Sequence, residues 1–343
     1  MYRCIQLAQN GKGFVEPNPM VGAVIVHNDI IIGEGFHRQY GEAHAEVNAI
    51  ASVKDQSLLS QSTMYVSLEP CSHYGKTPPC SKLIIDKKIP KVVIGCIDPF
   101  SEVSGRGIRM LQEAGVEVKI NILKEECERL NIRFFTFIQK KRPYIILKWA
   151  QSADGFIDKK RNLGNGEKPA RLSNDFTQLS THKMRAEHSA ILVGLNTALL
   201  DNPTLTTRLW DGKNPLRIAI DKDLNIPENS NLLDGNTPTL IYTSKKKESE
   251  KNIIYQKIEF DKNILPQIMT DLYNRNVQSL IVEGGSILLN SFIQSGLWDE
   301  ARVETASILL GSGVAVPYLK GDLLNTLKCK KSVISQYENQ QIP

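Results

Sequence analysis

Short apolar runs alternate with amphipathic segments along the first half of the chain. Runs rich in Val and Ile predict β-strands, because they are brief and bounded by turn residues. Segments with apolar residues three or four apart predict helices. The expected strands are 21–26, 30–35, 64–68, 91–97 and 116–120, and the expected helices are 44–53, 80–87, 105–114 and 123–139. This alternation is typical of a three-layer α/β domain.

A charged cluster with a proline, Lys140-Lys141-Arg142-Pro143, follows the expected helix 123–139 and precedes an apolar strand, 144–150. Alternation then resumes, with further strands at 190–193, 216–220, 239–242, 279–282 and 300–304 and helices at 174–185, 264–274 and 286–294. A chain of 343 residues is long enough for two cores. We therefore predict two α/β domains, residues 1–141 and 142–343.

Composition and charge narrow the function classes. The chain is 41% hydrophobic and 23% charged, with a net charge of +5. This mild excess suits a phosphorylated small molecule and does not by itself indicate nucleic acid. Apolar runs as short as 21–26 cannot span a membrane, and the N-terminus lacks the pattern of a signal peptide. The six irregularly spaced cysteines favour a reducing cytoplasm rather than a disulfide framework.

Candidate metal ligands gather between residues 44 and 80. His44 and Cys80 each begin a predicted helix, and Cys71 follows the predicted strand 64–68. One imidazole and two thiolates form a natural zinc site that leaves a fourth position for water. His-x-Glu followed by Pro-Cys is the signature of zinc deaminases, in which the glutamate, here Glu46, moves protons.

The spacing of the two cysteines departs from that signature. It closes with Cys-x-x-Cys, but Tyr74 stands at the second position, and eight residues separate Cys71 from Cys80. A longer insert can still return a thiolate to the metal, and its residues would then line the pocket. We interpret His73 as a contact to substrate or solvent rather than a ligand.

A second, weaker signal is Gly284-Gly285 between a predicted strand and a predicted helix. Glycines there allow backbone N–H groups to approach a phosphate at the helix N-terminus. The same pattern is also common in turns without a ligand, so the motif alone leaves both interpretations open.

The first half resembles the deaminase half of the bifunctional riboflavin-biosynthesis deaminase/reductases, which belong to the cytidine-deaminase-like superfamily. The resemblance rests on residues 17–22 (PNPMVG), 44–46 (HAE) and 69–80 (EPCSHYGKTPPC). The long insert between the cysteines is this family's own form of the motif. The resemblance implies His44, Cys71 and Cys80 as zinc ligands, Glu46 as the proton shuttle, and Asn18, His37 and Lys76 as substrate contacts.

The second half resembles the reductase half of the same family, which has a dihydrofolate-reductase-like fold and uses NADPH. The matching segments are 148–155, 185–186, 197–208 and 282–285. The resemblance implies NADPH contacts at Ala150, Thr197, Asp201, Gly285, Ser286, Ile287, Leu288, Leu289, Asn290 and Ser291. It implies substrate contacts at Arg185, Leu205, Arg208 and Glu283, and we add Lys148, for which the alternative is a strand-end lysine in solvent.

One loop departs from the family pattern. The usual Gly-Glu-Ser is followed by a tryptophan, whereas this chain has Gly166-Glu167-Lys168-Pro169-Ala170-Arg171. Because the aromatic residue is missing, no role is assigned to Pro169 or Arg171.

The resemblance implies a bifunctional enzyme without nucleic-acid or membrane partners, assembled as a dimer or tetramer. Its first reaction is the zinc-dependent deamination of 2,5-diamino-6-(5-phosphoribosylamino)pyrimidin-4-one. Its second is the NADPH-dependent reduction of the ribosyl group, which gives 5-amino-6-(5-phosphoribitylamino)uracil.

Two alternatives remain at this point. A tRNA or nucleoside deaminase with an accessory domain is disfavoured by the long inter-cysteine loop and by the lack of a basic stretch interleaved with aromatics. A non-catalytic zinc module would require a fourth protein ligand and would leave Glu46 without a task.

Overall fold

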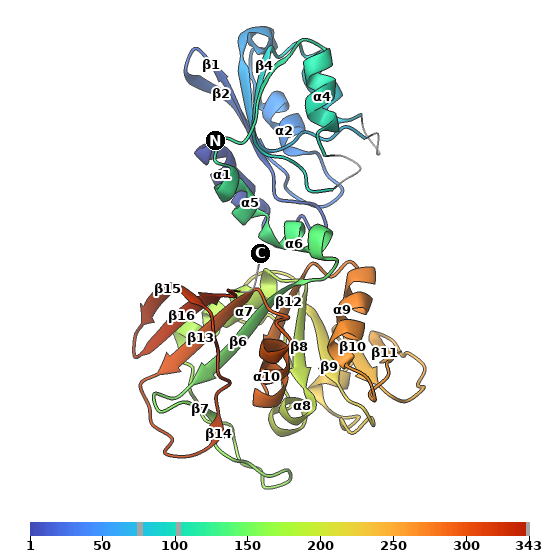
Figure 1. Ribbon diagram of the computed structural model, residues 1–343, viewed down its shortest axis with the longest axis vertical. Coiled ribbons are helices and arrows are strands. Elements are labelled where there is room, and N and C mark those ends of the chain that lie inside the picture. The colour runs from blue at the N-terminus through green and yellow to red at the C-terminus, as the bar shows by residue number, and fades with distance from the viewer. Residues whose placement is uncertain (74–77, 101–103, 341–343) are drawn as a thin grey trace. The chain divides into compact units, whose positions relative to one another are not determined.

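The computed structural model describes residues 1–73, 78–100 and 104–340. The chain divides into two compact units, Met1–Lys141 and Arg142–Pro343, and each is described by itself (Figure 1). No helix in the described part of the chain is both long enough and apolar enough to cross a membrane.

The first unit is built on a five-stranded sheet in the order β2-β1-β3-β4-β5. The antiparallel pairs are β2 with β1 and β1 with β3, whereas β3, β4 and β5 run parallel. The strands are β1 (Gly22–His27), β2 (Ile30–Phe36), β3 (Thr63–Leu68), β4 (Lys91–Cys96) and β5 (Glu117–Lys119).

Helices cover both faces of this sheet because its strands alternate apolar side chains toward each face. Ala23 and Ile25 point into the core with α2 (Ala45–Ser52), α3 (Cys80–Asp86) and α4 (Arg106–Glu113). Val24, between them, packs on the opposite face with α1 (Tyr2–Ala8). The remaining elements of the unit are α5 (Lys124–Leu130), α6 (Ile132–Lys140) and the 3-10 turns η1 (Gln9–Gly11) and η2 (Gln56–Gln61).

The single helix predicted over 123–139 is wrong, since α5 ends and α6 begins at Asn131. The Asn131 side chain is buried and pairs with the backbone of Met20, accepting from its N–H and donating to its carbonyl, both at 2.8 Å. A helix break therefore satisfies backbone groups in the distant segment that contains Asn18, a pairing that local helical spacing does not reveal.

The second unit is built on a nine-stranded sheet in the order β11-β10-β9-β8-β12-β6-β13-β16-β15. The first seven strands of this order run parallel, and β16 and β15 are antiparallel additions at one edge. The strands are β6 (Tyr144–Gln151), β8 (Ala190–Gly194), β9 (Leu216–Ile220), β10 (Thr239–Thr243), β11 (Ile253–Lys257), β12 (Ser279–Glu283), β13 (Glu300–Ala306), β15 (Asp322–Cys329) and β16 (Ser332–Glu338).

Two apolar cores sandwich this sheet. Helices α9 (Ile264–Asn274) and α10 (Ser286–Gln294) pack on one face, while α7 (Asp175–Ala186) and α8 (Leu195–Asp201) contribute to the core on the other. A small ribbon of β7 (Phe156–Asp158) and β14 (Val314–Ala315) and the 3-10 turn η3 (Asn231–Leu233) complete the unit. Of these elements, α8, β7, β11, β14, β15 and η3 were not predicted, because they are short or lack a clear apolar period.

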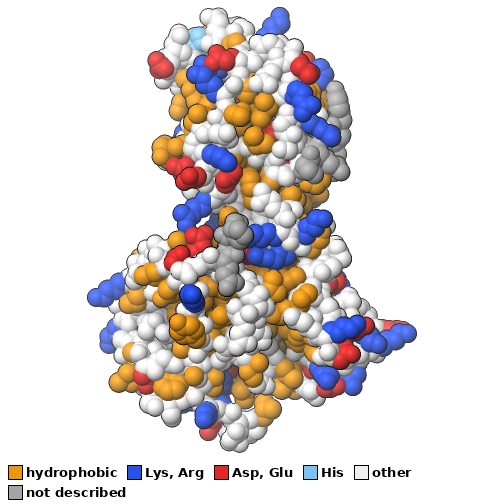
Figure 2. All heavy atoms as spheres, viewed as in Figure 1, with side chains coloured by type: hydrophobic (Ala, Val, Ile, Leu, Met, Phe, Trp, Pro, Cys, Tyr) orange, Lys and Arg blue, Asp and Glu red, His pale blue; other side chains and the backbone are white. Residues whose placement is uncertain are grey.

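The visible face of each unit mixes both signs of charge with apolar side chains (Figure 2). No continuous basic stripe crosses the described part of this face, which agrees with the small net charge of +5.

Close approach of β2 to α2 depends on Gly35. A Cβ atom there would lie 2.3 Å from the backbone N of Ala49 and 2.6 Å from the carbonyl oxygen of Ala45. We expect Gly35→Ala to push α2 away from the sheet and to lower the free energy of unfolding by about 1–3 kcal/mol. Chemical denaturation of the full chain measures this loss. Gly194→Ala is the control, because its Cβ would meet Leu288 at an ordinary 3.7 Å; equal stability of the two variants would contradict the expectation.

Candidate metal centre and cofactor cleft

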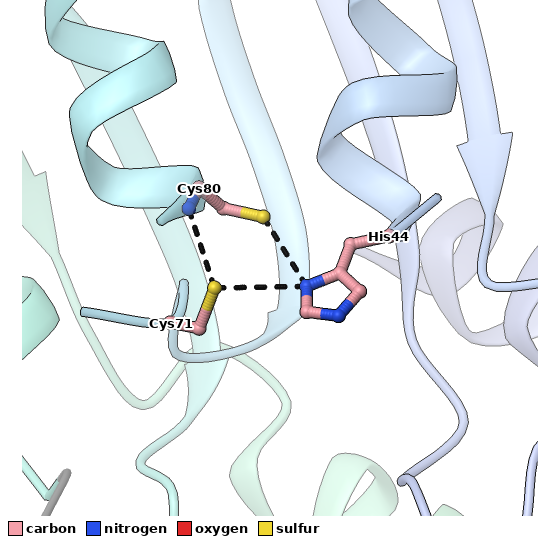
Figure 3. A group of neighbouring side chains, drawn as sticks. All are labelled: His44, Cys71 and Cys80. Atoms are coloured by element: carbon pink, nitrogen blue, oxygen red, sulfur yellow. Dashed lines mark hydrogen bonds between the residues drawn. The ribbon is translucent and has the colours of Figure 1, made fainter. Parts of the chain in front are cut away.

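Three metal-ligating side chains converge at one end of the first unit. The donor atoms of His44, Cys71 and Cys80 all lie within 4.8 Å of one another. The His44 Nδ1 atom is 3.6 Å from the Cys71 sulfur and 3.4 Å from the Cys80 sulfur (Figure 3). One nitrogen and two sulfurs that face a common point suit Zn²⁺, which prefers such ligands in tetrahedral sites.

Local structure places each of these ligands. His44 precedes α2 in an extended backbone conformation, and its side chain makes no cap hydrogen bond, so the imidazole is available for a metal. Cys71 follows the end of β3, and Cys80 is the first residue of α3. The backbone N–H of Cys80 donates to the Cys71 sulfur at 3.2 Å, which brings the two cysteines together across the long insert.

Glu46 lies in the first turn of α2 and is only 3% exposed. Burial and, after it, the neighbouring Cys71 raise the pKa of Glu46 to about 7, although His44 opposes both effects. A buried carboxyl group beside three ligand side chains has the position and the proton affinity of a general acid–base group.

Asn18 and His37 form a hydrogen-bonded pair beside His44. The Nδ1 atom of His37 lies 3.1 Å from the Ala43 carbonyl, which can only accept, so Nδ1 carries the proton. The other ring nitrogen then accepts from the Asn18 amide at 3.1 Å. The His37 ring is 2% exposed and stands edge-on to His44, with 5.4 Å between ring centroids. Burial lowers the pKa of His37, which agrees with a neutral ring that orients Asn18.

Glu69 organises the neighbouring loop, and sequence reasoning assigned it no role. Its buried carboxylate accepts from the backbone N–H groups of Gly105 at 3.0 Å and Gly107 at 2.9 Å. Gly107 must be glycine because a Cβ atom there would lie 2.1 Å from the Pro70 carbonyl oxygen. The N-terminus of α4 is thus held against the segment that leads to Cys71. Only the position of Glu69 immediately after a strand hinted at this function.

The long insert is described only in part. Lys76, the predicted substrate contact, lies outside the described residues, as does Tyr74. His73 is exposed and is not part of the ligand cluster formed by the described residues.

A cleft of about 840 Å³ opens in the second unit. Most of the predicted reductase residues line it: Lys148, Ala150, Arg185, Thr197, Asp201, Leu205, Glu283, Gly285, Ser286, Ile287, Leu288 and Ser291. Three of the predicted residues, Leu289, Asn290 and Arg208, do not line the cleft. Leu289 is on the inward face of α10 and packs in the apolar core, Asn290 bonds back to Ser286, and Arg208 bonds to Thr206.

The Gly284-Gly285 turn joins β12 to α10 within this cleft. Both glycines have positive φ angles, +91° and +79°, which disfavour side chains. A Cβ atom on either would lie 3.3 Å from the Thr197 hydroxyl, so the turn approaches α8 closely. The turn exposes the start of a nine-residue helix to the cleft, an arrangement suited to phosphate.

An ionic triad lies on the wall of the cleft. The Glu283 carboxylate accepts from Lys148 and from Arg185, both at 2.9 Å. Burial on its own would raise the pKa of Glu283, but Arg185 and Lys148 lower it to about 2. The Lys148 side chain is only 12% exposed, so the alternative of a lysine in solvent is wrong.

Sequence reasoning missed a second charged group in the cleft. The Arg161 guanidinium lies between Asp158 and the predicted cofactor residue Asp201 and also donates to the Leu200 carbonyl at 3.1 Å. It thereby ties the loop after β7 to the end of α8. Pro169 and Arg171, which were left without a role, also line the cleft. Arg161 precedes residues 166–171, where this chain lacks the tryptophan of the family pattern.

Comparisons with known proteins agree over both units. Residues 1–96 match the cytidine and deoxycytidylate deaminase zinc-binding region, and residues 143–342 match the RibD C-terminal domain. The riboflavin biosynthesis protein RibD of Bacillus amyloliquefaciens is 40% identical over 337 residues, which cover 96% of this chain and 89% of that protein. The chain belongs to the RibD family.

Solved structures support the same membership. A diaminohydroxyphosphoribosylaminopyrimidine deaminase/5-amino-6-(5-phosphoribosylamino)uracil reductase from Thermotoga maritima superposes with a TM-score of 0.88 and 34% identity, covering 99% of this chain and 97% of its own. RibD of Acinetobacter baumannii gives the same TM-score at 28% identity, covering 99% and 98%. The expected fold class, a cytidine-deaminase-like domain followed by a dihydrofolate-reductase-like domain, is confirmed, as are zinc and NADPH as the cofactors of a RibD protein.

The low pKa of Glu283 has a consequence for the stability of this RibD protein. Its pKa falls from about 4.3 in an unfolded chain to about 2, so its ionised form stabilises the fold above pH ~4.3. This contribution disappears as the pH falls from ~4.3 to ~2. We expect Glu283→Gln to cost about 3 kcal/mol near neutral pH, because two cations lose their partner. The cost should shrink below pH ~4.

Denaturant titrations of the wild type and of Glu283→Gln between pH 2 and pH 7 measure the difference in their free energies of unfolding. Glu250→Gln is a control in the same unit, because the Glu250 side chain is 61% exposed and lies 3.6 Å from Lys247 at the surface. A cost for Glu283→Gln that stays constant over the whole pH range would contradict the expectation.

Proposed function

We propose that the two units catalyse consecutive reactions of riboflavin biosynthesis, in agreement with membership in the RibD family. Met1–Lys141 deaminates 2,5-diamino-6-(5-phosphoribosylamino)pyrimidin-4-one by hydrolysis. Arg142–Pro343 then reduces the ribosyl group to ribityl with NADPH, which gives 5-amino-6-(5-phosphoribitylamino)uracil. The observation that carries this proposal is the convergence of His44, Cys71 and Cys80 beside the buried Glu46.

In the first reaction, His44, Cys71 and Cys80 hold the zinc ion through one nitrogen and two sulfurs. When bound, the zinc acts as a Lewis acid that makes water a better nucleophile at neutral pH. A site with three protein ligands retains a position for this chemistry, whereas a structural site uses four. This distinction separates a catalyst from the non-catalytic zinc module.

Glu46 moves the protons of this reaction. Its carboxylate carries one proton of the attacking water to the ring nitrogen and then the second proton to the amino group, which leaves as ammonia. The α2 helix holds Glu46 two positions after His44, so the base faces the same space as the ligands. Asn18, oriented by His37, and Lys76 contact the substrate.

In the second reaction, the cleft binds NADPH and substrate side by side. NADPH supplies the hydride, and the protein holds the two reactants against each other. Ala150, Thr197, Asp201, residues 285–288 and Ser291 contact the cofactor. Lys148, Arg185, Leu205 and Glu283 contact the substrate.

Arg185 is the strongest candidate for recognising the phosphate of the substrate. Its side chain lines the cleft, donates to Glu283 at 2.9 Å and to the Thr206 carbonyl at 3.2 Å, and is largely buried. Its Nε atom is buried without a hydrogen-bond partner among the described residues. An unsatisfied buried donor is costly, so an anionic ligand that accepts from it would complete the site.

Both reactions fit the cytoplasm. The six cysteines are all free in the structure, and two of them are needed as metal ligands. A reducing compartment keeps such thiols available.

We also propose that the chain forms a homo-oligomer, a dimer or a tetramer. The edge strand β15 exposes Leu323 (57%) and Leu327 (55%), an arrangement that leaves apolar area and unpaired backbone groups open to a second copy. We expect Leu323→Lys/Leu327→Lys to shift the protein toward the monomer in analytical ultracentrifugation. The matched variant Lys328→Leu on the same strand should not dissociate it. An unchanged assembly in the double variant would rule out this face.

Glu46→Gln tests the role of the proposed proton carrier. The amide cannot take up a proton, so we expect ammonia release to fall by about a thousandfold while zinc per chain stays at the wild-type level. NADPH oxidation with the deaminated intermediate should also persist. Glu42→Gln, at an exposed position before α2, is the matched control and should keep both activities. Wild-type ammonia release by Glu46→Gln would refute the role.

A further inference from the structure

A buried carboxylate, Glu304, lies behind one wall of the cleft in the second unit. Glu304 is 4% exposed, and its Oε2 atom accepts from the Ser173 hydroxyl at 2.6 Å. Its Oε1 atom is buried without a hydrogen-bond partner among the described residues. Ser173 itself lines the cleft. Within the described part of the chain, the Ser173 hydroxyl therefore gives this carboxylate the only hydrogen bond that it receives.

Strand pairing places Glu304 next to the cleft. Glu304 on β13 is paired with Ala150 on the parallel strand β6, and paired residues point to the same face of a sheet. The preceding residue, Val303, packs in the core with α9 and α10, so Glu304 points to the opposite face. Ala150, a predicted NADPH contact, lines the cleft, whereas Glu304 does not. Glu304 thus reaches a ligand through Ser173.

The segment before α7 holds Ser173 in place on both sides. Leu172 is buried. The Asn174 side chain caps α7 and donates to the Cys329 carbonyl at 3.2 Å and to the Ser332 hydroxyl at 3.1 Å. Because both neighbours are fixed, the Ser173 hydroxyl occupies a defined position on the wall of the cleft.

The Ser173 hydroxyl is available to a ligand only as an acceptor. A serine hydroxyl has one hydrogen to donate and two lone pairs, and a carboxylate has no hydrogen to give. The hydrogen of Ser173 is therefore committed to Glu304. Turning it toward a ligand would leave a buried charge without a hydrogen bond, which costs more than one neutral hydrogen bond returns. The lone pairs remain for a ligand that donates.

Different parts of the cleft favour different ligand groups. Arg185 and the Gly284-Gly285 turn offer positive charge and backbone N–H groups, which suit phosphate. Ser173 offers lone pairs beside a negative charge, which suit an uncharged N–H donor. Lys148 and Glu283, the predicted substrate contacts, belong to β6 and β12, and β13 follows β6 in the sheet. The nicotinamide must lie at this end to pass its hydride to the substrate, and its carboxamide carries the only N–H groups of that ring.

We propose that Ser173 accepts a hydrogen bond from the nicotinamide carboxamide of NADPH, and that Glu304 is a positioning residue that keeps Ser173 in the accepting state. This inference rests on the proposed reductase function, because it adds a contact at the reactive end of the cofactor. It also gives the buried carboxylate a task, which is to fix the direction of one hydroxyl.

Calorimetry with NADP⁺ and with its 3-acetylpyridine analogue tests the proposal without turnover. The analogue has a methyl group in place of the amide –NH₂, so it keeps the carbonyl and lacks the N–H donor. We expect the wild type to bind NADP⁺ more tightly than the analogue. Ser173→Ala should reduce this ratio of Kd values by about three- to tenfold, the worth of one neutral hydrogen bond. Ser173→Thr, which keeps a hydroxyl, should retain the ratio.

Glu304→Gln separates positioning from packing. Glutamine fills similar space but brings N–H donors of its own, so it releases the hydroxyl hydrogen of Ser173. We expect Glu304→Gln to reduce the ratio as Ser173→Ala does, and the double variant to lose no more than Ser173→Ala alone. An unchanged ratio in Glu304→Gln, or an additive loss in the double variant, would contradict the positioning role.

Ser180→Ala is the matched control. Ser180 also bonds to a charged residue of β13, Arg302, at 2.5 Å, but it does not line the cleft, so its variant should keep the wild-type ratio. KM for the deaminated pyrimidine at saturating NADPH should stay within about twofold in Ser173→Ala. An unchanged ratio in Ser173→Ala, an equal loss of affinity for both probes, or a rise only in the KM of the pyrimidine would overturn the proposal. Discrimination between the probes by a protein that does not oxidise NADPH would instead leave Ser173 assigned and refute the reductase.

Discussion

Parallel strand pairing is the constraint on which both sites depend. Strands that run the same way bring their carboxyl ends to one edge, so residues far apart in the chain meet there. In the first unit, β3 and β4 are parallel, and the residues after β3 lead directly to Glu69 and Cys71. In the second unit, β6, β12, β8 and β9 are parallel, and their ends carry the cleft. The site residues are thus concentrated at the carboxyl ends of the strands, while helices cover the faces of the sheets.

Buried carboxylates in this protein depend on neighbouring protein groups, such as cations or backbone N–H donors, because solvent does not reach them. Glu283 stays ionised because two cations contact it, and Glu69 is satisfied by backbone N–H groups at the start of α4. Glu46 has no comparable set of donors among the described residues, and burial raises its pKa. Environment therefore assigns different tasks to three carboxylates. Two hold structure in place, and the third is suited to exchange protons.

Family membership and local physical chemistry explain different aspects of the protein. The RibD family gives the pair of reactions and the two cofactors. The contacts in this chain show how the pieces are held, as when Arg161 ties the loop after β7 to Asp201. That loop also contains residues 166–171, where the tryptophan of the family pattern is missing. The ion pairs of Arg161 hold the loop in place. Arg161, which precedes the divergent residues, anchors the end of α8.

The sequence by itself determined most of the alternation of strands and helices, and it predicted the cluster of His44, Cys71 and Cys80 beside Glu46, because period and motif are local properties. It also indicated most of the cleft residues through family resemblance. Tertiary structure alone revealed the break at Asn131, which depends on a partner at Met20, and the pairing of Lys148 with Glu283. Such facts depend on which distant segments become neighbours, and strand order decides this, not the residues along a single strand.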